Sequence, residues 1–226
     1  MPPSDLIDFL QSGEQPIYVG FSSVVIDNPE ILTATVPKAN QSVGLRAIIS
    51  RGRSILEAAP SDAVFYMDDC PHEWLFQHVA AIVYHGGAGT TACALLHGRP
   101  AAAIPFCSDQ PLWGNAVAAC GAGPKPIPYR ALNAANLANA IRFCLRPETV
   151  GAAQDMACKI QRESGLTAAV EAFYRKLPWD RMPCQLLPDQ PASWVYHGGG
   201  EPIYLSKVAA QILVSSLRVK REDLEL

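Results

Sequence analysis

Short apolar runs alternate with longer segments of helical character through most of this chain. The runs are PIYVGFS at 16–22, LRAIIS at 45–50, AVFYM at 63–67, AIVY at 81–84 and AAAI at 101–104. Runs this short and this continuously apolar are typical of strands buried on both faces of a parallel sheet. The alternation predicts an α/β fold, a Rossmann-like parallel sheet with helices on both faces.

Helices are expected between and after these runs. They are predicted at 28–42, 71–78, 88–97 and 110–120, from Asn133 onward, and across 148–176, with one more short strand near 125–127. Pro37 stands inside the first helix. Because proline removes a backbone donor and clashes with the preceding turn, we expect a kink or a break there.

The chain changes character near its end. The proline-rich stretch LPWDRMPCQLLPDQP predicts an extended linker, and Lys207–Val219 has the pattern of a last amphipathic helix. We therefore divide the chain into a polar lead at 1–15, a Rossmann-like domain at 16–176, and a linker with a C-terminal helix at 177–226.

Composition excludes several classes of protein. Apolar residues make up 49% and charged residues 17% of the chain, with a net charge of -3, which predicts a globular protein and gives no electrostatic basis for binding nucleic acid. Seven cysteines without a CxxC pair predict neither a disulfide framework nor a zinc site. No basic leader and no apolar run of about 18 residues is present, so we expect a soluble, cytoplasmic protein.

The strongest functional signal is HGGAGTT at 85–91, which lies between an apolar strand and a helix start. A helix N-terminus exposes unpaired backbone N–H groups, and glycine lets the backbone approach a phosphate closely. The pattern is neither GxGxxG nor GxxxxGK[ST], and glycines that merely form the turn are the alternative interpretation. We expect a diphosphate to be bound here by His85, Gly86, Gly87, Ala88, Gly89, Thr90 and Thr91.

A second signal, PFCSDQ at 105–110, follows another strand. Asp109 and Gln110 stand at its helix start, where a carboxylate and an amide can hydrogen-bond neighbouring sugar hydroxyls. Asp109 as an ordinary helix N-cap is the alternative. Since the carboxyl ends of parallel strands share one sheet edge, we expect both residues to bind a sugar beside the glycine turn.

The third signal is DDCPHEWLF at 68–76. Its His72 and His78 lie six residues apart, so they do not share one helical face as HExxH requires, and a zinc protease is excluded. Its aromatic residues are either core or base-stacking residues. His72 and the backbone of Asp69 and Cys70 are candidates to contact a nucleobase and ribose.

Taken in order, PIYVGFSS, ISRG, DDCPHEWLF, HGGAGTT, PFCSDQPLWG and GPKPIP resemble the C-terminal half of UDP-glucose:sterol glucosyltransferases, a branch of the GT-B UDP-glycosyltransferases. The resemblance covers roughly residues 16–214. It implies that the chain binds UDP-glucose as donor substrate, with no other cofactor. We expect no metal, because Asp68 and Asp69 are adjacent and no acidic DxD stands at a strand end. The resemblance places residues 85–91 and Ser23 on the diphosphate and Asp109 and Gln110 on the hexose. The base and ribose region is implied to comprise Arg51, Asp69, Cys70, His72 and Trp74.

The resemblance also implies what this chain does not hold. In that family the catalytic base is a histidine of the N-terminal domain, so we expect no catalytic residue here, and contact with a sterol or lipid acceptor only through that absent domain. The expected function is the donor-binding domain of an enzyme that transfers glucose to a sterol or lipid hydroxyl, weak or inactive alone and in peripheral contact with membranes. Two alternatives stay open: one subunit of a two-chain glycosyltransferase, which docks an acceptor-domain subunit, and a non-catalytic UDP-sugar-binding module, which Ser22 and Pro37 favour.

Overall fold

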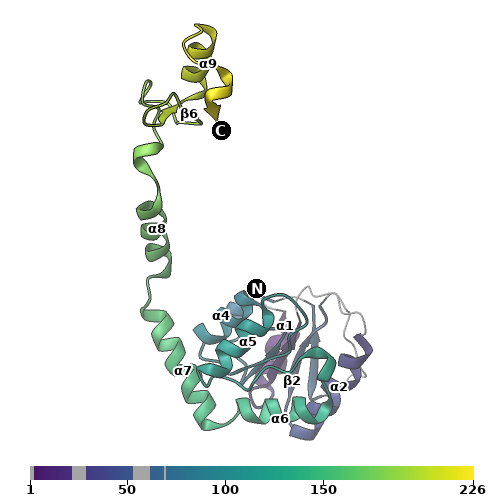
Figure 1. The fold of residues 1–226 in the computed structure, drawn as a ribbon. Helices are drawn as coiled ribbons and strands as arrows, with labels where there is room; N and C mark the ends of the chain where they lie inside the picture. The colour runs from purple at the N-terminus through teal and green to yellow at the C-terminus, as the bar shows by residue number, and fades with distance from the viewer. Residues whose placement is uncertain (1–2, 22–28, 53–61, 69) are drawn as a thin grey trace. The chain divides into compact units, whose positions relative to one another are not determined.

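The computed structural model describes residues 3–21, 29–52, 62–68 and 70–226, which form two compact units (Figure 1). The first unit is Met1–Glu163 and the second is Ser164–Leu226. This division falls earlier than the boundary after residue 176 drawn from the sequence. The last long helical segment therefore belongs to the second unit.

A five-stranded parallel sheet forms the centre of the first unit. Its strands are β1 (Ile17–Gly20), β2 (Ala47–Ser50), β3 (Val64–Met67), β4 (Ile82–Tyr84) and β5 (Ala101–Ala103). Their spatial order is β3-β2-β1-β4-β5, and every neighbouring pair is parallel. The predicted Rossmann-like sheet is confirmed. From β1 the chain continues to β2 and β3 on one side of β1, and it then returns to form β4 on the other side of β1. A topological switch point therefore lies between β1 and β4.

Helices cover both faces of this sheet (Figure 1). They are α1 (Ser4–Gln11), α2 (Pro29–Val43), α3 (His72–Leu75), α4 (Ala88–Leu96), α5 (Gln110–Ala119), α6 (Ala134–Cys144) and α7 (Pro147–Arg162), with a 3-10 turn, η1, at Tyr129–Ala131. Alternation along each strand divides the core. Ile17 and Val19 pack with residues of α2 and α6, whereas Tyr18 packs with residues of α1, α3, α4, α5 and α7.

The break expected at Pro37 and the strand expected near 125–127 are not found in the described residues. Helix α2 runs without a break through Pro37. Proline cannot donate a backbone hydrogen bond within the helix. The burial of Leu32, Val36 and Ala39 in the core offsets the stability lost with that bond. The segment 125–127 is not a strand, although Ile127 donates its backbone N–H to the Ala103 carbonyl at 3.0 Å.

The second unit holds more structure than the predicted linker and helix. It contains α8 (Gly165–Lys176), η2 (Trp179–Arg181), β6 (Trp194–Tyr196), β7 (Ile203–Leu205), α9 (Lys207–Ser215), η3 (Arg221–Asp223) and β8 (Leu224–Glu225). The three strands form an antiparallel sheet in the order β7-β6-β8. Helix α9 begins at the predicted Lys207 and packs on this sheet through Ala209 and Ala210, which share a small core with Leu205.

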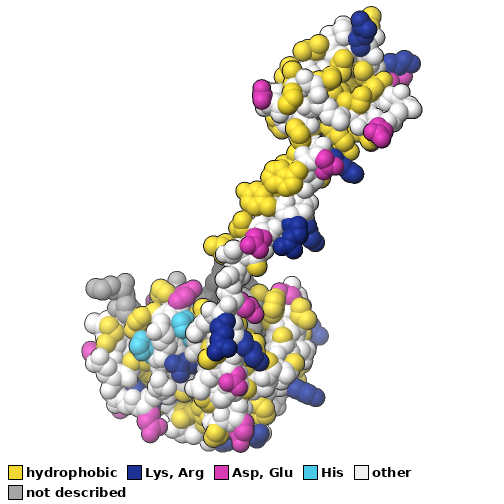
Figure 2. Space-filling view, turned by 90° about the vertical axis from the view of Figure 1, so that its left-hand side faces the viewer, with side chains coloured by type: hydrophobic (Ala, Val, Ile, Leu, Met, Phe, Trp, Pro, Cys, Tyr) yellow, Lys and Arg dark blue, Asp and Glu magenta, His cyan; other side chains and the backbone are white. Residues whose placement is uncertain are grey.

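The surface mixes charges of both signs. Figure 2 shows acidic and basic side chains interspersed on the visible face of each unit, between hydrophobic and uncharged groups. Within the described part of the chain, no helix is both long and apolar enough to cross a bilayer.

Candidate functional site

The predicted site residues follow the carboxyl ends of the strands of the parallel sheet. Arg51 follows β2, Asp68 follows β3, His85 follows β4, and the loop that begins at Ile104 follows β5. Ligands of such sheets bind outside these strand ends, at the switch point of the topology. Here the switch point lies beside β4, so His85 and the start of α4 stand where a ligand is expected.

The N-terminus of α4 is uncapped. Its N-cap residue is Gly87, which has no side chain to accept a hydrogen bond, and the first intrahelical bond runs from the Thr91 N–H to the Gly87 carbonyl at 2.9 Å. Among the described residues, none accepts a hydrogen bond from the N–H of Ala88, Gly89 or Thr90. Ala88 and Gly89 are exposed. The helix therefore presents free donors and its partial positive charge at the sheet edge.

Two glycines of the turn have different structural roles. Gly86 has a φ of +90°, and a Cβ there would lie 2.7 Å from the Gln110 carbonyl oxygen, so the turn needs glycine. A Cβ at Gly89 would instead meet no protein atom within 4 Å. Open space therefore lies in front of the first turn of α4.

The imidazole of His85 is half-buried beside this turn. Its Nδ1 is buried and, among the described residues, has no hydrogen-bond partner. Burial, together with the charge of His72, lowers the pKa of His85, and the charge of Asp109 opposes this effect. The ring is thus neutral at pH 7. A buried polar atom without a partner is unusual in folded proteins and indicates a group that a ligand or water satisfies.

The predicted phosphate donor Thr91 points into the protein. It is 4% exposed, its hydroxyl lies 2.8 Å from the Tyr84 hydroxyl, and it donates to the Gly87 carbonyl at 2.9 Å. Burial raises the pKa of Tyr84 to about 12, so the phenol stays protonated. Thr91 fixes α4 against β4, and Thr90, which is half-exposed, is the threonine at the open end of the helix.

Asp109 lies on the turn between β5 and α5. The Trp113 indole N–H donates to its Oδ2 at 2.8 Å, and this bond lowers the pKa of Asp109. The carboxylate is exposed and ionised at neutral pH. Asp109 is the N-cap residue of α5, but its side chain makes no capping hydrogen bond to the helix. Ser108 before it has a φ of 56°, a conformation that non-glycine residues rarely adopt outside functional sites and turns.

Gln110 holds the same turn from inside. It is 7% exposed, and its Oε1 accepts the backbone N–H of Phe106 at 2.8 Å and of Cys107 at 3.2 Å. The structure therefore separates the two predicted sugar ligands. Asp109 faces outward, and Gln110 shapes the turn that presents it.

The predicted base and ribose set is also divided. The His72 Nε2 lies 3.1 Å from the Tyr18 hydroxyl, and its ring stacks on Phe76 with centroids 4.7 Å apart. Cys70 is buried in the core, and Trp74 packs on the His78 ring with centroids 4.6 Å apart. These contacts favour the core interpretation for Trp74. The burial of the Cys70 side chain leaves the predicted role of its backbone as a prediction.

Arg51 is held at the end of β2. Its guanidinium pairs with Asp68 at 3.3 Å and donates to the Tyr66 carbonyl at 3.3 Å. The other two predicted residues, Ser23 and Asp69, lie outside the described residues.

Sequence reasoning missed two residues that orient the site. Trp113 lies four residues after Asp109, a spacing that brings side chains together on a helix, and this spacing could have revealed the contact. Tyr18 reaches His72 across 54 positions of sequence, and no local pattern signals such a pair.

The sequence of the chain is similar to that of known glycosyltransferases. Residues 43–166 match the erythromycin biosynthesis protein CIII-like C-terminal domain. The sterol 3-beta-glucosyltransferase UGT80A2 of Arabidopsis thaliana is 40% identical over 179 residues, which cover 78% of this chain and 28% of that protein. The UDP-sugar-dependent glycosyltransferase 52 of Dictyostelium discoideum is 32% identical over 92% of this chain and 14% of its own length.

Solved structures agree on the fold. The glycosyltransferase of kitacinnamycin superposes with a TM-score of 0.61 at 17% identity, over 79% of this chain and 45% of that chain. The match supports a parallel five-stranded sheet with helices, as in one half of a GT-B glycosyltransferase. The chain spans less than a third of the length of the curated relatives named above.

Proposed function

The chain belongs to the family of erythromycin biosynthesis protein CIII-like C-terminal domains, and from this premise we propose that it binds the nucleotide-sugar donor of a glycosyl transfer. The uncapped N-terminus of α4 carries this proposal. Its free N–H groups, the neutral His85 ring and the open space before Gly89 suit a diphosphate. Asp109, exposed and ionised on the neighbouring turn, suits the hydroxyls of the hexose.

We infer that the donor is UDP-glucose and the acceptor a sterol hydroxyl. The names of the two relatives support this choice, since one is a sterol glucosyltransferase and the other depends on a UDP-sugar. We place the acceptor and its catalytic base outside residues 1–226. A sterol acceptor would bring the working enzyme to a membrane surface on the cytoplasmic side.

The proposed reaction assigns the chain a role in leaving-group departure. An acceptor oxygen forms a bond to C1 of the glucose while the bond from C1 to the β-phosphate oxygen breaks, and UDP leaves with the electron pair. The acceptor proton passes to the base of the acceptor-binding part. Negative charge grows on the departing diphosphate, and the N–H groups of Ala88, Gly89 and Thr90 would stabilise it without reorganisation.

Titration calorimetry with UDP-glucose tests the proposal. Wild-type protein should bind with a Kd in the range typical of substrates, roughly 1 μM to 1 mM. Gly89→Ala adds a methyl group in the open space before α4, and this group should weaken UDP-glucose binding about tenfold. The same change should improve helix propensity by about 1 kcal/mol. Gly151→Ala is the matched control, since Gly151 lies in α7 and its added Cβ also meets no protein atom within 4 Å.

The two outcomes are distinct. Loss of affinity in Gly89→Ala alone supports the proposal. Absence of saturable heat with wild-type protein, or equal affinity of the two variants, contradicts it.

Leu112 favours a second candidate, a subunit of a two-chain glycosyltransferase. This side chain is 65% exposed on α5 next to Trp113, at the sheet edge where an acceptor subunit would dock. An assay of the chain alone with UDP-glucose and a sterol distinguishes both candidates from a complete enzyme. A donor-binding domain and a subunit of a two-chain enzyme both predict no turnover without a second component.

A further inference from the structure

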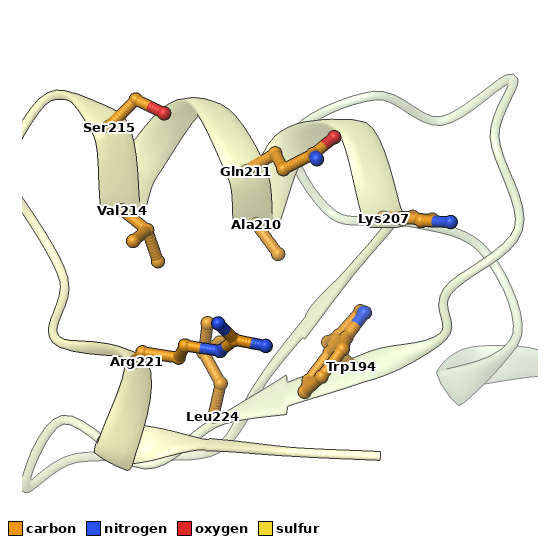
Figure 3. Close-up of a pocket in the computed structure, with 8 residues that line it drawn as sticks. All are labelled: Trp194, Lys207, Ala210, Gln211, Val214, Ser215, Arg221 and Leu224. Atoms are coloured by element: carbon orange, nitrogen blue, oxygen red, sulfur yellow. The ribbon is translucent and has the colours of Figure 1, made fainter.

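The second unit contains a hollow that the donor site does not use. It lies between α9 and the β7-β6-β8 sheet and has a volume of about 250 Å³ (Figure 3). Ligand pockets are commonly about 300–1,000 Å³, so this space suits a small molecule or one end of a larger one.

Small residues on α9 create the hollow. Trp194 on β6 and Leu224 on β8 lie on the sheet face that α9 covers. Opposite them, α9 presents Ala210 and Val214, one helical turn apart, and both side chains point toward the sheet in Figure 3. An alanine facing an indole leaves space that a larger side chain would fill. The walls are therefore apolar and partly aromatic.

Two cations border the same space. Lys207 lies at the start of α9, and Figure 3 shows the guanidinium of Arg221 extending between α9 and Trp194. Among the described residues, neither cation has an ion-pair or hydrogen-bond partner. Within the described part of the chain, no carboxylate lines the hollow.

Two acidic residues of η3 and β8 lie close to other groups. Glu222 pairs with Lys220 at 3.4 Å, and Glu225 with His197 at 3.4 Å. Neither of these carboxylates contacts Lys207 or Arg221.

We propose that this hollow is a second binding site, for a small organic anion with a flat apolar body. The body would lie against Trp194, Val214 and Leu224, and a carboxylate or similar group would accept hydrogen bonds from the Arg221 guanidinium. The proposal is independent of donor binding, because every residue that carries it belongs to the second unit.

The probe is 2-naphthoate, and 2-naphthalenemethanol is its neutral counterpart. The full chain labelled with 5-fluorotryptophan gives four ¹⁹F signals, one per tryptophan, and Trp194→Phe identifies the signal of Trp194. Titration with naphthoate should shift this signal saturably, with a Kd below about 1 mM. The alcohol should bind about tenfold more weakly, since it cannot pair with the guanidinium.

Arg221→Gln tests the charge directly. It should raise the Kd for naphthoate about tenfold and leave the affinity for the alcohol unchanged. Arg218→Gln removes the same charge from an exposed residue that does not line the hollow and should change the Kd less than about twofold.

Several results would overturn the proposal. They are no saturable shift of the Trp194 signal, equal binding of acid and alcohol, equal behaviour of the two arginine variants, and a common shift of all four signals, which indicates non-specific binding. The acid and alcohol comparison on the wild-type chain is decisive by itself, so it holds even where a variant folds poorly.

Discussion

The orphaned Nδ1 of His85 is the most informative atom of the first unit. Its ring is kept neutral by burial, next to N–H groups that have no acceptor among the described residues. A neutral ring can donate one hydrogen bond to a phosphate oxygen, and it avoids burying a charge when no ligand is bound. The same arrangement makes stability sensitive to acid.

Stability should fall as pH drops below about 6.5, the ordinary pKa of histidine. In the unfolded chain His85 takes up a proton near that pH, whereas in the folded protein its lowered pKa delays protonation. Between these two pKa values the unfolded state binds more protons than the folded state. The free energy of unfolding therefore decreases as the pH falls, until the pH is below the pKa of His85 in the folded protein. Urea unfolding at pH 7.5 and 5.5 should show a smaller acid loss for His85→Gln than for wild-type protein. Equal losses would contradict the assigned pKa shift.

Site residues were predictable from the sequence where the backbone conformation alone requires a particular residue type. The turn at Gly86 needs a positive φ, and its place between a strand and a helix is visible in the sequence. Side-chain direction was not predictable. Thr90 and Thr91 are neighbours in the same motif, but the helix turns Thr91 inward to Tyr84, a partner that only the fold supplies.

At the scale of elements, the turn between β5 and α5 is built around one buried amide. Gln110 satisfies two consecutive backbone N–H groups, so the turn keeps its shape without regular secondary structure. Ser108 adopts its unusual φ within this turn. Asp109 is thereby held outward, with its carboxylate oriented by Trp113.

Gln110→Met should destabilise the first unit by about 1–3 kcal/mol, because methionine fills the space but leaves two N–H groups without an acceptor. Hydrogen exchange should show lost protection at Phe106 and Cys107. Asn115→Met, an exposed change on the same helix, should stay within about 0.5 kcal/mol of wild type. Unchanged exchange at both amides would show that the Gln110 side chain does not hold the turn.

The strands of the first unit were predictable from the sequence, whereas those of the second unit were missed. Strands buried on both faces read as continuous apolar runs, which is why β1 to β5 were found. The strands β6, β7 and β8 have two or three residues each, which is too few to show a periodic pattern in the sequence. Proline-rich sequence around them resembles a linker, although its backbone is bonded, as in the N–H of Cys184 to the Gln190 carbonyl at 2.9 Å.

Across the whole molecule, the cores of the two units are separate. Both core clusters around the parallel sheet lie within the first unit, and the third cluster, around Leu205, lies within the second. Each unit should therefore respond to mutation by itself.

Ser206→Ala tests this independence. The Ser206 side chain accepts the N–H of Ala209 at 3.2 Å and caps α9, so its loss should cost the second unit about 0.5–2 kcal/mol. Hydrogen exchange should speed up across α9 and β7 and stay unchanged in β1 and β4. Faster exchange in both units would show a single cooperative core.

We propose that the free N–H groups at the start of α4 bind the diphosphate of a nucleotide sugar. This proposal is tested most directly by titrating ¹⁵N-labelled protein with UDP-glucose and following each backbone amide. The amides of Ala88, Gly89 and Thr90 should shift saturably and together, and the amide of Asp109 should shift with UDP-glucose but not with UDP alone. Saturable binding that leaves the amides of Ala88, Gly89 and Thr90 unmoved would contradict it.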